Sequence, residues 1–314
     1  MYKTLIQLVL LLILVLIFYF IYNKYFYTED IVDELKNPPS INKEIAETND
    51  LSNKNLINEN TDNEIIEILP GGISHPGGLA VSQNSLVVAD IQSVRAFNLG
   101  TKEEDWVLRN IFRSSPLGAS TSAASLDNNI ILTSWLDNTV KILDPSNGQI
   151  IKSFEGLNIP ISTAKFDGHY AVALHGNNSI SLLKEDGSLK ILSDEFDSPT
   201  HVVNYKEGLL VSDRNRGELI MVSAEGETNT LITGLDSPEG IAILGDTIFV
   251  YEGNTGEIKS ISENKISIIA KLSAGSPAAS PMQPPSMVFN GLVAYEGSVY
   301  ATDEMKRAIF KITP

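Results

Sequence analysis

Two polar side chains interrupt a repeated stretch of this sequence. Glu239 lies in SPEGIA and Asn290 lies in FNGLVA, at a position that Gly77 occupies in the related stretch HPGGLA. Carboxylate and amide oxygens are the ligands that Ca²⁺ and Mg²⁺ prefer in proteins. The pair therefore predicts a divalent-cation site, with Ca²⁺ as the candidate cofactor. The alternative for Glu239 is a solvated carboxylate at a rim.

Further candidates for chemistry fall at related points of the chain. His175 and His201 are candidate proton carriers, and the alternative for both is an ordinary polar lining. The candidate ligand-binding residues are Trp135, Thr200 and Asp213. The sequence contains no Gly-x-Ser-x-Gly stretch, so a serine nucleophile on a strand-to-helix elbow is not expected.

All these residues belong to a fifteen-residue repeat, hereafter the frame, which runs from a turn residue through a variable slot and two apolar runs to an end slot. The six copies of this frame are 76–90, 121–135, 161–175, 199–213, 238–252 and 289–303. The second and third copies match the pattern less closely than the other four. The variable slots hold Gly77, Ser122, Ser162, Thr200, Glu239 and Asn290. The end slots hold Asp90, Trp135, His175, Asp213, Glu252 and Asp303. The acidic end-slot residues can also cap tight turns by accepting bonds from backbone N–H groups.

The apolar runs of the frame are rich in Val, Ile, Leu, Phe and Tyr and are typical of β-strands. Two more strand-like runs follow each frame, so each copy predicts a four-stranded sheet. A repeat of about 40 residues built this way indicates a β-propeller. Six frames predict six blades, with both slots around one end of the central channel. A parallel β-helix is the alternative, although its repeats are shorter.

The ends of the repeat region predict how the ring closes. The last frame is followed by a single strand-like run, RAIFKITP, so its blade lacks an outer strand. Residues 64–69 resemble the outer strand that precedes every other frame. We therefore expect 64–69 to complete the last blade, which leaves no open sheet edge between the first and last blades.

The region before the repeats predicts a membrane anchor and a linker. Residues 5–22 are apolar apart from Gln7, nearly the length that a spanning helix needs, and tyrosines follow them. No small residues mark a signal-peptide cleavage site there. The expected domains are a transmembrane anchor at 1–27, a disordered acidic linker at 28–63 and the propeller at 64–314. The basic residues weakly favour a single-pass cell-membrane protein with the propeller on the extracytoplasmic side.

Composition excludes several partner classes and site types. The formal net charge of -16 repels phosphate backbones, so no nucleic-acid partner is expected. The absence of cysteine excludes disulfides, thiolate metal sites and a cysteine nucleophile. The expected partners are the membrane, through the N-terminal helix, and a small molecule or protein at the propeller mouth.

The stretches HPGGLAVSQNSLVVADIQSVRAF and SPTHVVNYKEGLLVSDRNRGELIMV resemble NHL-type repeats. The region 64–314 resembles the six-bladed propellers of the SMP-30/gluconolactonase and strictosidine-synthase-like group. That resemblance implies a divalent ion in the channel, with Asn290 matching the Pro-Asn-Gly pattern of these families. The family's first-blade carboxylate is replaced by Gly77. Two functions follow: a membrane-tethered ligand- or protein-binding module or, alternatively, a metal-dependent hydrolase of lactones or esters.

Overall fold

The protein is described by a computed structural model over residues 57–59, 63–68, 73, 75–90, 93–109, 122–126, 129–135, 137–263, 265–274 and 289–314. Residues 56–314 form one compact unit. The expected anchor at 5–22 and most of the expected linker lie outside the described residues. Within the described ranges, no helix is both long and apolar enough to cross a membrane.

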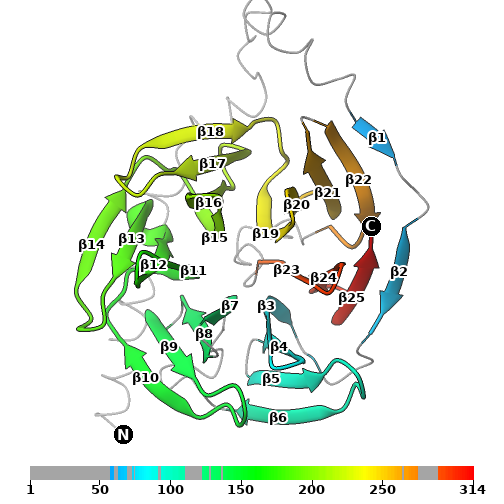
Figure 1. The fold of residues 1–314 in the computed structure, drawn as a ribbon, viewed down its shortest axis with the longest axis horizontal. Helices are drawn as coiled ribbons and strands as arrows, with labels where there is room; N and C mark the ends of the chain where they lie inside the picture. The colour runs from blue at the N-terminus through cyan, green and yellow to red at the C-terminus, as the bar shows by residue number, and fades with distance from the viewer. Residues whose placement is uncertain are drawn as a thin grey trace, which may run out of the picture. The chain divides into compact units, whose positions relative to one another are not determined.

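The described strands form six sheets arranged around a central axis, which confirms the all-β, six-bladed propeller (Figure 1). Blade 1 consists of β3 (Pro76–Ser82), β4 (Ser85–Asp90), β5 (Ser93–Asn98) and β6 (Glu104–Arg109). Blade 2 consists of β7 (Ser122–Leu126), β8 (Asn129–Ser134), β9 (Thr139–Leu143) and β10 (Ile150–Phe154). Blade 3 consists of β11 (Pro160–Phe166), β12 (His169–Leu174), β13 (Ser179–Leu183) and β14 (Leu189–Ser193), with a short 3₁₀ turn at His175–Asn177.

The remaining blades repeat this order from the axis outward. Blade 4 consists of β15 (Pro199–Tyr205), β16 (Gly208–Asp213), β17 (Glu218–Val222) and β18 (Thr228–Ile232). Blade 5 consists of β19 (Pro238–Leu244), β20 (Thr247–Glu252), β21 (Glu257–Ser262) and β22 (Lys265–Lys271). Blade 6 consists of β23 (Leu292–Tyr295), β24 (Ser298–Asp303), β25 (Ala308–Thr313) and β2 (Glu64–Glu67).

Burial falls from the middle of each blade to its outer edge. Every residue of β16 is buried, because both faces of that strand pack against neighbouring blades, whereas the first three residues of β14 are exposed. Leu209 and Val211 of β16 share one core cluster with Ala171 of blade 3. Apolar side chains packed between sheets therefore hold the blades together.

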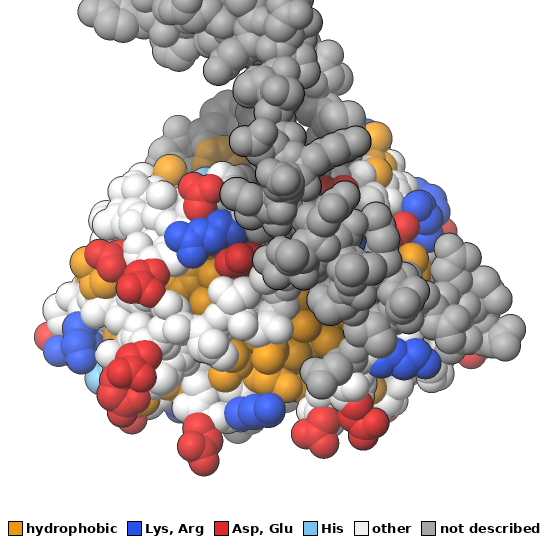
Figure 2. Space-filling model, turned by 90° about the horizontal axis from the view of Figure 1, so that it is seen from above, with side chains coloured by type: hydrophobic (Ala, Val, Ile, Leu, Met, Phe, Trp, Pro, Cys, Tyr) orange, Lys and Arg blue, Asp and Glu red, His pale blue; other side chains and the backbone are white. Residues whose placement is uncertain are grey.

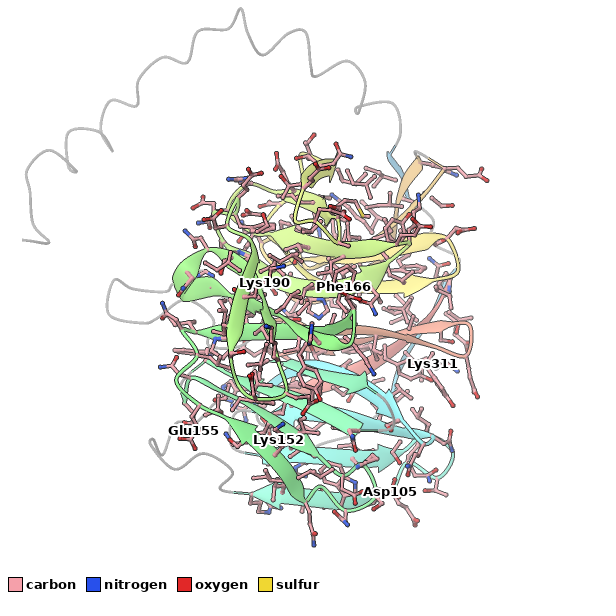
Figure 3. The ribbon with its side chains drawn as sticks, turned by 60° about the vertical axis from the view of Figure 1, so that its left-hand side comes forward. Asp105, Lys152, Glu155, Phe166, Lys190 and Lys311 are labelled. Atoms are coloured by element: carbon pink, nitrogen blue, oxygen red, sulfur yellow. The ribbon has the colours of Figure 1, made fainter. Side chains whose placement is uncertain are left out.

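The outer strands carry a mixed surface. Acidic, basic and apolar side chains are interspersed on the flank (Figure 2). Lys152 of β10 and Lys190 of β14 lie on neighbouring outer strands (Figure 3). Lys152 Nζ lies 2.6 Å from Glu185 Oε2, which links the flanks of blades 2 and 3. Both side chains are exposed, so the pair contributes under about 1 kcal/mol.

The predicted closure of the ring is confirmed. Strand β2 pairs antiparallel with β25, with Glu64 opposite Thr313 and Glu67 opposite Phe310. The backbone N–H of Ile68 continues the pairing by donating to Ile309 O at 2.9 Å. The strand ends at Glu67, and Leu69 lies outside the described residues. A strand from before the first frame therefore completes the last blade.

Three residues within the expected linker at 28–63 form a strand. Residues Ile57–Glu59 form β1, which pairs in parallel with β22 at the outer edge of blade 5. Asn63 Nδ2 donates to Ile269 O of β22 at 2.9 Å. The segment before β2 gains these contacts because the outer edge of β22 offers unpaired backbone groups. Composition alone could not show that edge.

The two loosely matching frames are each shifted by one residue. Pro199 pairs with Asp213 in blade 4, and Pro160 pairs with Leu174 in blade 3. The blade-3 frame therefore runs from Pro160 to Leu174. In blade 2, Ser134 pairs with Thr139, as Asp213 pairs with Glu218 in blade 4. The end slots of blades 2 and 3 are thus Ser134 and Leu174, and Trp135 and His175 each lie one residue later.

Candidate functional site

The acidic end slots lie where the innermost strands begin, at what we call the strand-start end of the channel. Asp213 is fully buried. Its Oδ2 accepts from the backbone N–H of Asp197 at 2.7 Å, and its Oδ1 accepts from that of Ser198 at 3.0 Å. Through these bonds Asp213 caps the turn, which is the alternative to its role as a ligand-binding residue. Both oxygens are thereby engaged within the fold rather than exposed to a ligand.

The other acidic end slots act in the same way. Asp303 accepts from the backbone N–H groups of Ser273 and Lys306, each at 2.9 Å. Asp90 accepts from the backbone N–H of His75 at 2.7 Å. Each carboxylate therefore ties the incoming connection to the end of its blade's second strand.

Thr200, in the variable slot of blade 4, also serves the fold. Its side chain is 1% exposed. Its hydroxyl donates to Pro238 O at 3.1 Å and lies 3.0 Å from Ser212 Oγ, which itself donates to Glu239 O at 2.7 Å. These bonds join blades 4 and 5. The structure thus places Thr200 inside a blade interface, away from solvent.

The structure brings Glu239 and Asn290 together, as the frame predicts. Glu239 Oε2 accepts from the Asn290 backbone N–H at 2.9 Å and from Asn290 Nδ2 at 3.1 Å. The two residues are 2% and 3% exposed. Gly240 allows this approach, because a Cβ there would lie 2.6 Å from Asn290 O. The pair therefore forms a direct bond between blades 5 and 6.

Arg214 completes this buried group, and the sequence analysis did not identify it. Arg214 Nε lies 3.5 Å from Glu239 Oε1, and its side chain is 29% exposed. A Cβ on Gly253 would lie only 2.3 Å from the same carboxylate oxygen. One clue was available in the sequence. Arg214 directly follows the end slot of blade 4, and the corresponding residue in blade 5 is Gly253, which has no side chain to fill the same space.

Burial controls the ionisation of Glu239. Desolvation raises the pKa of its carboxyl, while the bonds from Asn290 and the charge of Arg214 oppose that rise. A cation site requires oxygens that are free to coordinate. Here one oxygen accepts two N–H bonds and the other faces a guanidinium, so the residues as arranged do not fit a Ca²⁺ site. The described residues also contain no group of three or more acidic or histidine side chains that could hold a metal.

The corrected register reveals a different set at the strand-start end. Trp135, His175 and Arg214 each directly follow the end slot in blades 2, 3 and 4. All three side chains are partly exposed, unlike the acidic end slots. An indole, an imidazole and a guanidinium thus occupy equivalent positions in three consecutive blades. We call these residues the mouth trio.

The imidazole of His175 is held beside the other blade-4 residues. Its Nδ1 lies 3.5 Å from Ser198 Oγ, and the backbone N–H of Arg214 donates to Ser198 O at 2.9 Å. Burial and the charge of Arg214 lower the pKa of His175, with an opposing contribution from Asp213. His175 is therefore neutral at neutral pH and able both to donate and to accept a hydrogen bond.

His201 lies elsewhere, on the third residue of β15 inside the channel. Its Nδ1 accepts from the backbone N–H of Ile241 at 3.2 Å. Burial lowers its pKa to about 4. No contact between His175 and His201 is found in the described part of the chain. The two candidate proton carriers therefore do not form one catalytic pair.

A cavity of about 350 Å³ lies on the axis and is lined by β3, β11, β15, β19 and β23. Its lining comes from the later residues of these strands, such as Val203 of β15 and Tyr295 of β23. It therefore lies toward the end where each innermost strand turns into the second strand, which we call the hairpin end. The sequence analysis placed no site there, because it assigned function only to the slots of the frame.

Comparisons with known proteins show the fold. No family model and no curated protein matches the chain. Among solved structures, a streptogramin B lyase is 14% identical, with a TM-score of 0.57 over 80% of this chain and 97% of its own. A provisionally named gluconolactonase is 14% identical, with a TM-score of 0.57 over 81% and 93%. A nidogen/laminin complex contains a chain 13% identical, with a TM-score of 0.57 over 72% and 88%.

The chain is similar in fold to these solved structures. Their low identity means that the likeness concerns the fold alone. Two are named as enzymes and one is named in a complex with another protein, so the shared architecture accommodates both kinds of function. The function of this chain must be argued from its own residues.

Proposed function

We propose that the chain is a binding module, tethered to a membrane by 5–22 and displaying its propeller on the extracytoplasmic side. Its ligand or protein partner docks at the strand-start end over blades 2 to 4. The mouth trio carries this proposal. Its three side chains reach the surface at equivalent positions, whereas the neighbouring carboxylates are used to hold the fold.

The chemistry of the mouth trio defines the partner. Trp135 offers an aromatic face for a planar or apolar group. His175, kept neutral, can donate or accept one hydrogen bond. Arg214 can receive a carboxylate, because its guanidinium keeps donors beyond the single contact with Glu239. The preferred partner is therefore a small molecule or peptide that carries an aromatic group next to a carboxylate.

A lactone or ester hydrolase is the second candidate. The observation that favours it is the raised pKa of Glu239, because a buried carboxyl beside an arginine is a common feature of active sites. Ca²⁺ remains a proposal within this candidate only. To bind an ion, Glu239 would have to give up its bonds to Asn290 and its contact with Arg214.

Binding and turnover measurements on one preparation separate the two functions. Aromatic carboxylates and their uncharged amides are screened by thermal shift, and lactones and esters are assayed with and without Ca²⁺. The binding module predicts stabilisation by the acids, reduced in Trp135→Ala and Arg214→Gln, without turnover. The matched control is Arg216→Gln, which changes a nearby arginine outside the mouth trio. Turnover abolished by Glu239→Gln would establish the hydrolase instead.

A further inference from the structure

The cavity at the hairpin end has a lining that differs from the rest of the protein. Ala164, Val203 and Ile243 represent its mainly apolar walls. No acidic side chain lines it among the described residues, although the chain as a whole carries a formal charge of -16. Lys165 is the charged residue among the described lining. A non-acidic cavity of this volume, lined mainly by apolar residue types, falls within the range of small-molecule sites.

Thr163 borders this cavity, but its hydroxyl does not face it. The residue is 3% exposed, and its Oγ1 is buried without a hydrogen-bond partner among the described residues. A molecule in the cavity therefore cannot reach that oxygen as the side chain is placed.

His201 supplies a polar group that faces this cavity. Because its Nδ1 accepts the Ile241 N–H, the neutral ring carries its proton on Nε2. No described residue accepts from that nitrogen. Ser162 occupies the equivalent position in blade 3, where its Oγ accepts from the Val202 N–H at 3.3 Å. Ser162 and His201 therefore both accept a backbone N–H from the next blade. The His201 ring differs because it also carries a donor, Nε2–H, at the cavity.

We propose that this cavity is a second binding site, separate from the mouth trio, for a small and mostly apolar molecule with one oxygen acceptor and no positive charge. The oxygen accepts from His201 Nε2–H. The apolar body packs against the innermost strands. A cationic group is disfavoured, because the described lining offers no carboxylate.

A displacement assay on residues 56–314, the compact unit that contains all six sheets, tests this site. The fluorescent probe is N-phenyl-1-naphthylamine, and the competitors are octanol, octanoate and octylammonium, which share one alkyl chain. We expect octanol and octanoate to displace the probe at least tenfold more effectively than octylammonium. Equal displacement by all three would overturn the proposed ligand class.

Variants identify the location and the polar contact. Ala294→Phe adds a ring to a partly buried lining position and should abolish probe binding; binding equal to wild type would overturn the site. His201→Phe removes the Nε2–H donor and should weaken octanol binding about two- to tenfold. Ser162→Ala, which loses the equivalent contact between blades outside the cavity, should leave octanol affinity unchanged. Thr163→Val should also leave it unchanged, because that hydroxyl is buried away from the cavity. Unchanged octanol affinity in His201→Phe would refute the assigned contact.

Discussion

Replacing Arg214 with glutamine should make the stability of the propeller depend on pH through Glu239. The substitution removes the guanidinium that lies 3.5 Å from Glu239 Oε1 and leaves the carboxyl, which is 2% exposed, with only its bonds from Asn290. A buried carboxylate that loses its cationic partner is destabilised, and it becomes neutral by taking up a proton when that costs less free energy.

The free-energy cost of protonating Glu239 sets an upper limit on the loss of stability. The ordinary pKa of Glu239 is 4.5. Protonation at pH 7 spans about 2.5 pH units and costs about 1.36 kcal/mol for each, or about 3.4 kcal/mol. Since part of the desolvation cost is already present in the wild type, we expect a loss of about 2 kcal/mol. At pH 5 the same limit falls to about 0.7 kcal/mol.

The sign follows from linkage. Burial already raises the pKa of Glu239 in the wild type, and the loss of Arg214 raises it further. The stabilisation by Arg214 is therefore present above the folded-state pKa of the wild type and disappears as pH falls through it. Urea unfolding of residues 56–314 at pH 7 and pH 5, followed by circular dichroism, measures the effect. Arg216→Gln is the control, because Arg216 is 42% exposed in its contact with Asp213 and should cost under about 1 kcal/mol at either pH. Equal losses at both pH values in Arg214→Gln would refute the reasoning.

Four further predictions concern the packing around Glu239, the closure of the ring, the cation site and the membrane anchor. Gly253→Ala should lower the melting temperature, because its Cβ would lie 2.3 Å from Glu239 Oε1; an unchanged calorimetric midpoint would contradict the packing. Deleting 64–67 should destabilise the propeller far more than deleting 28–55, since β2 is a paired strand; equal midpoints would argue against closure by this strand. Added Ca²⁺ should not raise the wild-type melting temperature, and a shift that Glu239→Gln abolishes would restore the cation site. Cell fractionation should leave the full chain with the membrane, and recovery of a soluble, N-terminally trimmed protein would rule out the anchor.

The sequence by itself determined the architecture. Alternating apolar runs with a period of about 40 residues require four-stranded sheets that bury both faces, and six copies give six blades. The missing outer strand of the last frame predicted the role of residues 64–67, because an uncovered edge would otherwise remain. The turn-capping role of Asp213 was also readable, since a short carboxylate after a strand commonly accepts backbone N–H groups.

Only the tertiary structure decided which of these residues remain accessible. The second strands of blades 2 and 3 are continuous runs buried on both faces, so two registers one residue apart look alike in the sequence. The actual register moved Trp135 and His175 out of the end slots and into positions equivalent to that of Arg214. Whether Glu239 meets an ion or an arginine depends on a side chain from the preceding blade, and no spacing along the chain encodes that distance. His201 became a channel residue because the innermost strands converge on the axis. Contacts between blades thus determined which side chains remain available for chemistry, because the hydrogen-bond partners of His201 and Glu239 lie 40 and 51 positions away along the chain.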